Sequence, residues 1–239
     1  MIPRRLVYII GMFVLTIAAC SSSSEAEQSF SETPTAVSIT SGTGNVTVTS
    51  TDSGAIVTAE ISASGDAPVW SAEIVGGELV IDDGCGDRTD CSVNLTVEVA
   101  GTADVTIASA AGGITVVDMN SALAISGVAS NVALNGITGP ISVDLTSGDL
   151  LGARLVSTDA SFHTGDGTVD VTLTETFGSL SVTSGSGNLT AQVPRGDYDI
   201  DASTGSGGVD IDSDVVHVDG SASSIVMRTD SGDVTLYRR

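Results

Sequence analysis

Short runs in which aliphatic residues alternate with Ser, Thr, Asp or Asn recur from residue 36 to the end of the printed sequence. Residues 93–99 (VNLTVEV) and 168–173 (TVDVTL) are clear examples. A period of two places the aliphatic side chains on one face of a strand and the polar side chains on the other. Clusters of Gly, Asn, Asp and Ser separate the runs, as turns require. The pattern predicts an all-β protein.

A glycine-containing phrase returns along the second half of the chain. Its first glycines, at positions 148, 165, 185, 205 and 232, are spaced by 17, 20, 20 and 27 residues. Such a repeat is a structural unit that buries its apolar face only against its neighbours. The phrase occurs at residues 147–150 (SGDL), 164–169 (TGDGTV), 184–189 (SGSGNL), 204–209 (TGSGGV) and 231–234 (SGDV), with a related form at 41–46 (SGTGNV).

This repeat favours a parallel β-helix, or β-solenoid, with coils of about 20 residues. An immunoglobulin-like β-sandwich is the alternative, but aromatic residues help to fill its core and only 3% of this chain is aromatic. Val, Ile and Leu suit a narrow interior in which each residue stacks on its equivalent in the next coil, and glycines suit the corners. Residues 104–237 would then form a rod roughly 30 Å long at the usual strand spacing.

Residues 36–100 are less regular, and we expect them to form the first coils and the cap of a single domain that spans residues 36–239. Gly76-Gly77 lies between two strand-like runs and predicts a tight hairpin turn. Trp70, the only tryptophan, is expected to cover the apolar end of the stack. At the other end of the domain, residues 236–239 (LYRR) are expected to blunt the last exposed strand edge with bulk and charge.

Residues 1–19 have the features of a lipoprotein signal peptide, with two arginines before an apolar run that is too short to span a bilayer comfortably. Residues 17–20 (IAAC) resemble the bacterial lipobox, so Cys20 is predicted to carry lipid, such as palmitate, and to become the mature N-terminus. An ordinary cleaved signal or a short N-terminal anchor is the alternative. The polar residues 20–35 are predicted to be a flexible tether with a span on the order of 20 Å. The expected location is therefore extracytoplasmic, on a bacterial membrane.

The chain is strongly acidic, with a formal net charge of −22 and no lysine. This charge repels nucleic acid and anionic lipid head groups, and the lack of lysine removes a common phosphate-binding group. Nucleic-acid binding is therefore excluded as a function. The same charge favours a soluble, monomeric body.

In an exported protein, each of the three cysteines can be assigned a role. If Cys20 carries lipid, Cys85 and Cys91 remain in one short glycine-rich loop. In an oxidising compartment they are predicted to form a disulfide. A metal site would need further ligands, and both histidines, His163 and His217, lie far along the chain.

The serial units resemble those of a bacterial candidate-adhesin family of β-strand-repeat proteins, DUF4097-like and often catalogued as a domain of unknown function. The resemblance rests on residues 91–97 (CSVNLTV), on 105–107 (VTI), on the repeated glycine phrases and on 230–236 (DSGDVTL). It covers most of the chain after the tether. It implies an exported, envelope-associated β-solenoid without established catalytic residues, so no site residue is carried over from the family.

Few residues in the sequence suggest chemistry, and no cofactor is expected. Each histidine lies in a strand-like run, where a solvated or corner position is the simpler interpretation. Acidic residues near the repeat boundaries could stack into a carboxylate ladder, and oxygen-rich turns can bind Ca²⁺. Asp166, Asp210 and Asp212 are the weak calcium candidates, with a solvated acidic face as the favoured alternative.

Together these features predict a non-enzymatic, lipid-anchored protein of the cell envelope that presents a rigid β-solenoid surface, either adhesin-like or as a scaffold. The expected partners are the membrane through the lipid, and a cell-wall polymer, a surface glycan or an envelope protein. A carbohydrate-active β-helix enzyme and an accessory or sensory subunit of an envelope-stress system are the alternative functions.

Overall fold

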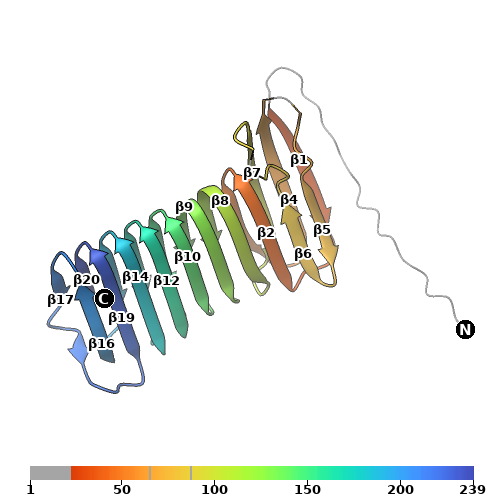
Figure 1. Cartoon of the computed structure of the whole chain (residues 1–239). Helices are drawn as coiled ribbons and strands as arrows, with labels where there is room; N and C mark the ends of the chain where they lie inside the picture. Colours follow the sequence, from red (N-terminus) through yellow and green to blue (C-terminus); the bar gives the residue numbers. More distant parts are fainter. Residues whose placement is uncertain (1–22, 65, 87) are drawn as a thin grey trace, which may run out of the picture.

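The computed structural model describes residues 23–64, 66–86 and 88–239, and the regular elements among them are all strands. Most of these strands stack side by side into a rod with a front and a back face (Figure 1). Within the described residues there is no helix long and apolar enough to cross a membrane. The all-β prediction is confirmed, and the parallel stacking is that of a solenoid rather than of an immunoglobulin-like sandwich.

The front face carries a row of parallel strands, with one antiparallel strand, β5, at its end. In spatial order these strands are β5 (Ser71–Val75), β6 (Glu78–Asp82), β2 (Ala36–Thr43), β8 (Asp104–Val117), β9 (Leu123–Asn135), β10 (Ile141–Ser147), β12 (Asp159–Asp166), β14 (Ser179–Ser186), β19 (Ser224–Ser231), β16 (Asp197–Thr204) and the short β18 (Val216–His217).

The back face continues each coil after a corner, and the second halves of β8 and β9 belong to it. Its first two pairings are antiparallel and the rest are parallel. In spatial order its other strands are β1 (Ser23–Phe30), β4 (Ala55–Ala63), β7 (Cys91–Ala100), β3 (Val46–Thr51), then β11 (Leu150–Leu155), β13 (Val169–Leu173), β15 (Leu189–Val193), β20 (Val234–Arg238) and β17 (Val209–Ile211).

The core lies between the two faces and consists of aliphatic columns that run along the rod. The alternation of each strand sends every second side chain inward, and parallel pairing in register aligns those side chains from coil to coil. One front column is Leu123, Ile141, Ala160, Leu180, Ile225 and Ile200. One back column is Val132, Leu150, Val169, Leu189, Val234 and Val209.

The order of coils along the rod differs from their order in the sequence. The C-terminal coil, β19–β20, lies between the coils β14–β15 and β16–β17. The expectation that residues 236–239 blunt the last strand edge is therefore wrong, because β20 is paired on both sides and β17 forms the edge instead. The spatial order also departs from the sequence order at the other end, where β2 lies between β6 and β8.

The predicted tether is corrected for residues 23–30. These residues form β1, which pairs antiparallel with β4 from Ser23↔Ser62 to Phe30↔Ala55. Their polar sequence does not prevent this, because the pairing uses backbone groups that every residue carries. The predicted signal peptide and Cys20 lie outside the described residues.

Antiparallel strands close the end of the rod that contains β1, β4, β5, β6 and β7, which we call the closed end (Figure 1). The predicted hairpin is present there, with Gly76 at φ 64° and Gly77 at φ 88° joining β5 to β6. A tight turn of this kind requires positive φ at both central residues, which glycine supplies. Trp70 is partly buried and packs against the core at this end.

Candidate functional site

The repeated glycine phrase forms one corner of the stack, and the first hydroxyl of its Gly-x-Gly copies at 164–169 and 184–189 points inward. Thr164 Oγ1 donates to the Gly148 carbonyl at 3.1 Å, and Ser184 Oγ donates to the Gly167 carbonyl at 3.2 Å. Both side chains are buried. Because a buried hydroxyl requires a partner, these groups hold one coil to the preceding one and are not available to a ligand.

The second glycine of the phrase allows neighbouring corners to approach closely. Gly187 has φ +143°, and a Cβ built on it would lie 2.0 Å from the carbonyl oxygen of Gly167. A Cβ built on Gly167 would likewise lie 2.0 Å from the carbonyl oxygen of Gly148. A larger residue at these positions would therefore separate the coils, and the repeated glycine has a packing role.

Where an Asn or Asp follows this glycine, it links its coil to the next. Asn188 Oδ1 accepts the Asp233 N–H at 2.9 Å, and Asp233 Oδ1 accepts the Gly208 N–H at 2.8 Å. Asn131 and Asp149 continue the same ladder in the middle of the rod. The phrase thus has a structural role, as its repetition predicted, but the sequence did not reveal this ladder of Asn and Asp hydrogen bonds.

The three calcium candidates do not form a carboxylate ladder at the repeat boundaries. Asp166 lies between Ser147 and Ser186 in the front-face register. Asp210 lies on β17 beside Thr235 of β20, three coils farther along the rod than Asp166. Asp212 Oδ1 accepts the backbone N–H of Asp214 at 3.0 Å. The structure therefore does not bring the calcium candidates Asp166, Asp210 and Asp212 together around one ion.

The front face carries a row of small, uncharged side chains that crosses five adjacent strands, which we call the hydroxyl row. Its members follow one line of the strand register: Thr106, Ala124, Ser142, Ser161 and Ser181. A shallow groove of about 500 Å³ runs over this row, with Asp104 and Asp159 along its border. Within the described chain, the hydroxyls of the row have no hydrogen-bond partner, in contrast to those of the corner phrase. They are available to an outside ligand.

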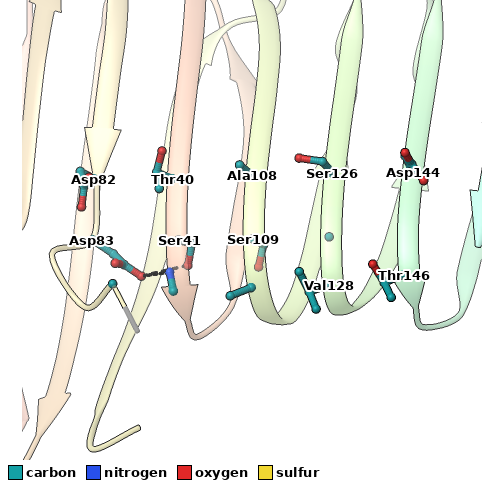
Figure 2. Close-up of a pocket in the computed structure, with 14 residues that line it drawn as sticks. Thr40, Ser41, Asp82, Asp83, Ala108, Ser109, Ser126, Val128, Asp144 and Thr146 are labelled. Carbon is teal, nitrogen blue, oxygen red and sulfur yellow. Dashed lines mark hydrogen bonds between the residues drawn. The ribbon is translucent and has the colours of Figure 1, made fainter. Parts of the chain in front are cut away.

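A second groove, of about 470 Å³, lies on the same face beside the disulfide loop (residues 83–91) (Figure 2). Thr40, Ala108 and Ser126 cross it on successive strands, with Asp82 at one end of this line and Asp144 at the other. Both grooves are open hollows in a nearly regular sheet surface.

The two exposed carboxylates of this second groove are too far apart for glycoside hydrolysis. Asp82 on β6 and Asp144 on β10 are separated by four strand spacings, or about 19 Å. Paired carboxylates in glycosidases are about 5–10 Å apart. Asp82 is also engaged locally, since its Oδ1 accepts the Gly84 N–H at 2.8 Å.

Asp83 is a buried carboxylate that organises the disulfide loop. It is 1% exposed, and its Oδ2 accepts the Gly42 N–H at 2.7 Å and the Ser41 hydroxyl at 3.1 Å (Figure 2). Its Oδ1 accepts the Cys85 N–H at 2.9 Å. Three donors satisfy the charge that burial would otherwise penalise. Asp83 therefore fixes the loop against the end of β2.

Cys85 and Cys91 form the predicted disulfide, and both are buried. In the same loop the Arg88 guanidinium donates to the Asp90 carboxylate at 3.1 Å. This hydrogen bond holds the pKa of Asp90 below, and that of Arg88 above, their ordinary values. The pair is exposed to solvent, where ion pairs contribute little to stability. The loop is thus held mainly by the disulfide and Asp83.

His163 is an exposed front-face residue rather than part of a catalytic triad. The register places it between Asp144 and Thr183. Its Nδ1 lies 2.9 Å from Thr183 Oγ1, and no hydrogen bond joins it to Asp144 within the described chain. A triad requires a nucleophile and an orienting carboxylate on opposite sides of the ring, and only one of these contacts is made.

His217 lies near two carboxylates, those of Asp199 and Asp219, with their ligand atoms within 4.8 Å of one another. Its Nδ1 accepts the backbone N–H of Ile200 at 3.1 Å, so the neutral ring carries its proton on Nε2, which contacts Asp219 Oδ1 at 3.0 Å. A metal bound at Nε2 would need that proton on Nδ1, where the Ile200 N–H already points. The arrangement favours a hydrogen-bonded clasp over a metal site.

Comparison with solved structures gives relatives of low sequence identity. A candidate adhesin from Bacteroides fragilis is 11% identical with a TM-score of 0.50, over 89% of this chain and 96% of that chain. A candidate cell adhesion protein from Clostridium sporogenes is 12% identical with a TM-score of 0.44, over 91% and 100% of the two chains. At such identity a likeness supports the fold alone. No curated protein matches the chain.

The family comparison agrees with the corner phrase and with the stacked strands. The family model described as Toastrack DUF4097 matches residues 88–237, which is more than half of the chain and includes every coil from β8 to β20. The chain belongs to the Toastrack DUF4097 family.

Proposed function

We propose that this protein is a lipid-anchored, non-enzymatic component of a bacterial cell envelope that presents its rigid front face to an envelope or surface partner, as an adhesin-like or scaffolding protein. The hydroxyl row is the observation that carries the proposal. It offers uncharged, unpaired hydroxyls on a surface that the stacked coils hold rigid. The disulfide supports an oxidising, extracytoplasmic setting.

The lipid anchor would fix the direction in which the rod points. Only Ser21 and Ser22 separate Cys20 from β1 in the sequence, and the three residue steps from Cys20 to Ser23 span at most about 11 Å. A lipid on Cys20 would therefore hold the closed end next to the bilayer. The coil β16–β17 would lie farthest from it, about 38 Å along the nine front strands from β6 to β16.

The partner classes consistent with this surface are a cell-wall polymer, a surface glycan and an envelope protein. Hydroxyl groups suit hydrogen bonding to each of them, whereas the net charge of −22 opposes anionic polymers, including nucleic acid. The wide separation of Asp82 and Asp144 gives no support to a carbohydrate-active enzyme.

The anchor is tested by replacing its attachment residue. Cys20→Ser in the full-length chain should move the protein from the membrane fraction to a soluble fraction, or leave an unprocessed precursor. Metabolic labelling with a fatty acid should label the wild type and not the variant. A wild-type protein that never takes up label would show that the anchor is absent.

The presenting face is tested by crosslinking intact cells and isolating what the lipoprotein captures. Ser142→Arg with Ser161→Arg places two bulky cations on adjacent strands of the hydroxyl row. Thr115→Arg with Ala133→Arg places the same pair on adjacent strands of the back face as the control. Capture should fall at least tenfold for the front pair only. Equal capture by both pairs would refute the front face as the presenting surface.

A further inference from the structure

The end of the rod opposite the closed end finishes on unpaired strand edges. We call this region, formed by β16, β17 and β18, the open end. Within the described chain β17 pairs only with β20, and β16 pairs with β19 and, at Asp197 and Tyr198 alone, with β18. The outer edge of β16 from Asp199 onward therefore has no strand beside it. Unpaired N–H and C=O groups on a strand edge can pair with a strand of another chain.

The open end also exposes side chains that are buried in every other coil of the regular stack. Val209 and Ile211 are 44% and 38% exposed, whereas Val234 and Leu236, their register partners on β20, are 0% exposed. Ile200 and Ala202 are half-buried on β16. We call these four residues the end patch: Ile200, Ala202, Val209 and Ile211.

Exposed apolar side chains are concentrated here. Of the ten large hydrophobic residues that are exposed in the described chain, four lie within residues 209–218, and two of these, Val209 and Ile211, occupy core positions of the terminal coil. Apolar side chains that gather on one surface mark an interaction site more often than scattered exposed residues do. The open end thus combines free backbone groups with an apolar contact area.

The charges around the end patch specify the kind of strand that fits. Residues 197–211 carry four aspartates and no basic residue. Their neighbour in the stack, residues 224–239, carries Arg228, Arg238 and Arg239. Arg228 pairs with Asp201, and Arg238 Nη2 lies 3.1 Å from Asp214 Oδ2. The inner edge of this acidic coil thus meets arginines of its neighbour, although that neighbour also carries Asp230 and Asp233, and the outer edge has the same acidic character.

A second copy of the protein is a poor occupant for this edge. Two open ends placed together would bring the aspartates of both terminal coils side by side, and like charges directly opposite are destabilising. Stacking the open end on the closed end of another copy meets the same obstacle. The outer strands there, β1 and β5, carry Glu25, Glu27 and Glu73 and no basic residue.

We propose that the open end is a strand-addition site for an extended, basic segment of a partner protein, in which aliphatic residues alternate with polar ones. Backbone groups of the segment would pair with the outer edges of β16 and β17. Its aliphatic side chains would cover the end patch, and its arginine or lysine side chains would approach Asp199 and Asp210. This inference does not depend on the role proposed for the front face.

The His217 clasp limits where this pairing begins. Its Nδ1 already accepts the Ile200 N–H at 3.1 Å, so that N–H is unavailable to an added strand. Because N–H groups alternate in direction along a strand, the next outward backbone groups on β16 belong to Ala202 and Thr204. The added strand would therefore pair with the part of β16 that leads to the corner, and with β17.

The probe is a fluorescein-labelled synthetic peptide with the sequence of residues 224–239 (SIVMRTDSGDVTLYRR). In the folded protein this sequence already pairs with the inner edge of β16–β17 and with β14–β15. Its pattern of side chains therefore suits pairing with the edge of a coil. A control peptide replaces its three arginines by glutamate. Fluorescence anisotropy with the intact protein should show saturable binding of the basic peptide, weakened by salt, and at least tenfold weaker binding of the control peptide.

Two protein variants locate the bound peptide. Ile211→Glu adds a charge to the end patch, and Ile56→Glu adds the same charge at the closed end, where Ile56 is also 38% exposed. Ile211→Glu should weaken peptide binding at least tenfold, whereas Ile56→Glu should leave it unchanged. A thermal melt of each variant shows whether the stack remains folded. Asp210→Arg, a fully solvated change on β17, should also weaken binding if Ile211→Glu proves unstable.

Three results would overturn the proposal. The first is no saturable binding of the basic peptide by the wild-type protein. The second is equal binding by the wild type, Ile211→Glu and Asp210→Arg, which would place the peptide elsewhere. The third is concentration-dependent dimerisation of the protein alone in analytical ultracentrifugation that Ile211→Glu abolishes, because the occupant would then be a second copy. Loss of front-face capture in cells would affect none of these measurements.

Discussion

The two ends of the rod terminate the same core in opposite ways. At the closed end, antiparallel strands continue the back face and a hairpin continues the front face. Val57 on β4 and Leu79 on β6 are accordingly 0% exposed. At the open end, Val209 and Ile211 occupy core positions and remain 44% and 38% exposed.

The difference shows that a solenoid repeat carries no cap of its own. Each coil buries its apolar side chains partly against the next coil, so the last one in space remains incomplete unless other sequence covers it. Residues 23–30 and 55–100 supply that cover with strands that lie outside the repeat. Residues 197–218 are an ordinary coil with a short following segment, and they leave the last core positions half open.

The largest expected effect comes from comparing two substitutions in one core column, one in the middle of the rod and one at the open end. Val171 is 0% exposed and lies in the same column as Ile211. Val171→Asp should lower the free energy of unfolding by about 4 kcal/mol, because it buries a carboxylate without a partner. Ile211→Asp should cost about 1 kcal/mol, because its site is partly solvated. Urea unfolding measures both, and equal losses would contradict the exposure of the open end.

The next effect contrasts a stacked corner with a free turn at the closed end. Gly187→Ala introduces a Cβ 2.0 Å from the Gly167 carbonyl oxygen in a glycine-only conformation, and should cost about 3 kcal/mol. Gly76→Ala also has positive φ but meets nothing within 4 Å, so only about 1 kcal/mol of backbone strain is expected. Thermal melts of the two variants give the comparison. A larger loss for Gly76→Ala would show that corner contact does not limit the spacing of coils.

The disulfide tests how firmly the closed end is fastened. Replacing Cys85 and Cys91 together by serine should lower the free energy of unfolding by about 2 kcal/mol, because the bond closes only a short loop. Proteolysis should then cut within residues 83–91 before it cuts the regular stack. Thiol labelling of the unreduced, unfolded wild type should find neither cysteine free. Cleavage beginning at the open end in both proteins would show that the loop does not limit the stability of the closed end.

The smallest effect concerns Tyr198, the fully buried aromatic residue next to the open end. Its hydroxyl donates to the Pro194 carbonyl at 2.7 Å, and its ring stacks on Phe177 at 5.3 Å. Tyr198→Phe removes the hydrogen bond and should cost about 1 kcal/mol. Tyr237→Phe, at a residue that is 39% exposed, is the control and should be close to neutral.

The same residue gives the open end a pH dependence. Burial raises the pKa of Tyr198 above its ordinary value of 10.0. The folded chain keeps this proton when the unfolded chain loses it, so the contribution to stability is complete below pH 10 and is lost as pH rises through the raised pKa. Melting temperatures between pH 9 and 11 should therefore fall more steeply for the wild type than for Tyr198→Phe. Parallel profiles would show that the tyrosine is not protected from ionisation.

Much of the fold could be predicted because it follows from local pattern. Alternation identified the strands, the glycine phrase identified a stacked repeat, and Gly76-Gly77 identified the hairpin. The strand β1 was missed because its pairing with β4 uses backbone groups and needs no aliphatic alternation. The disulfide was predicted because Cys85 and Cys91 lie in one short loop.

The candidate surfaces were less accessible to sequence reasoning. Thr106 and Ser161 lie in one row because of the register of the strands between them. The sequence alone does not give that register. Thr164 and Ser161 are both hydroxyl residues three positions apart, yet the first is buried in a corner bond and the second faces solvent. The alternation of β12 places Ser161 and Thr164 on opposite faces, but only the stacking of the coils brings the Gly148 carbonyl to the Thr164 hydroxyl.

The sequence by itself determined which residues enter the core, because the period of two and the aliphatic composition are properties of each strand alone. Only the tertiary structure decided the order of the coils. The edges of similar coils offer nearly the same backbone groups and aliphatic columns, so local pattern does not choose between them. The basic residues Arg228 and Arg238 contact acidic groups of the coil β16–β17 and the segment after it, and this contact exists only once the C-terminal coil lies inside the stack. That placement leaves an acidic, apolar edge at the open end.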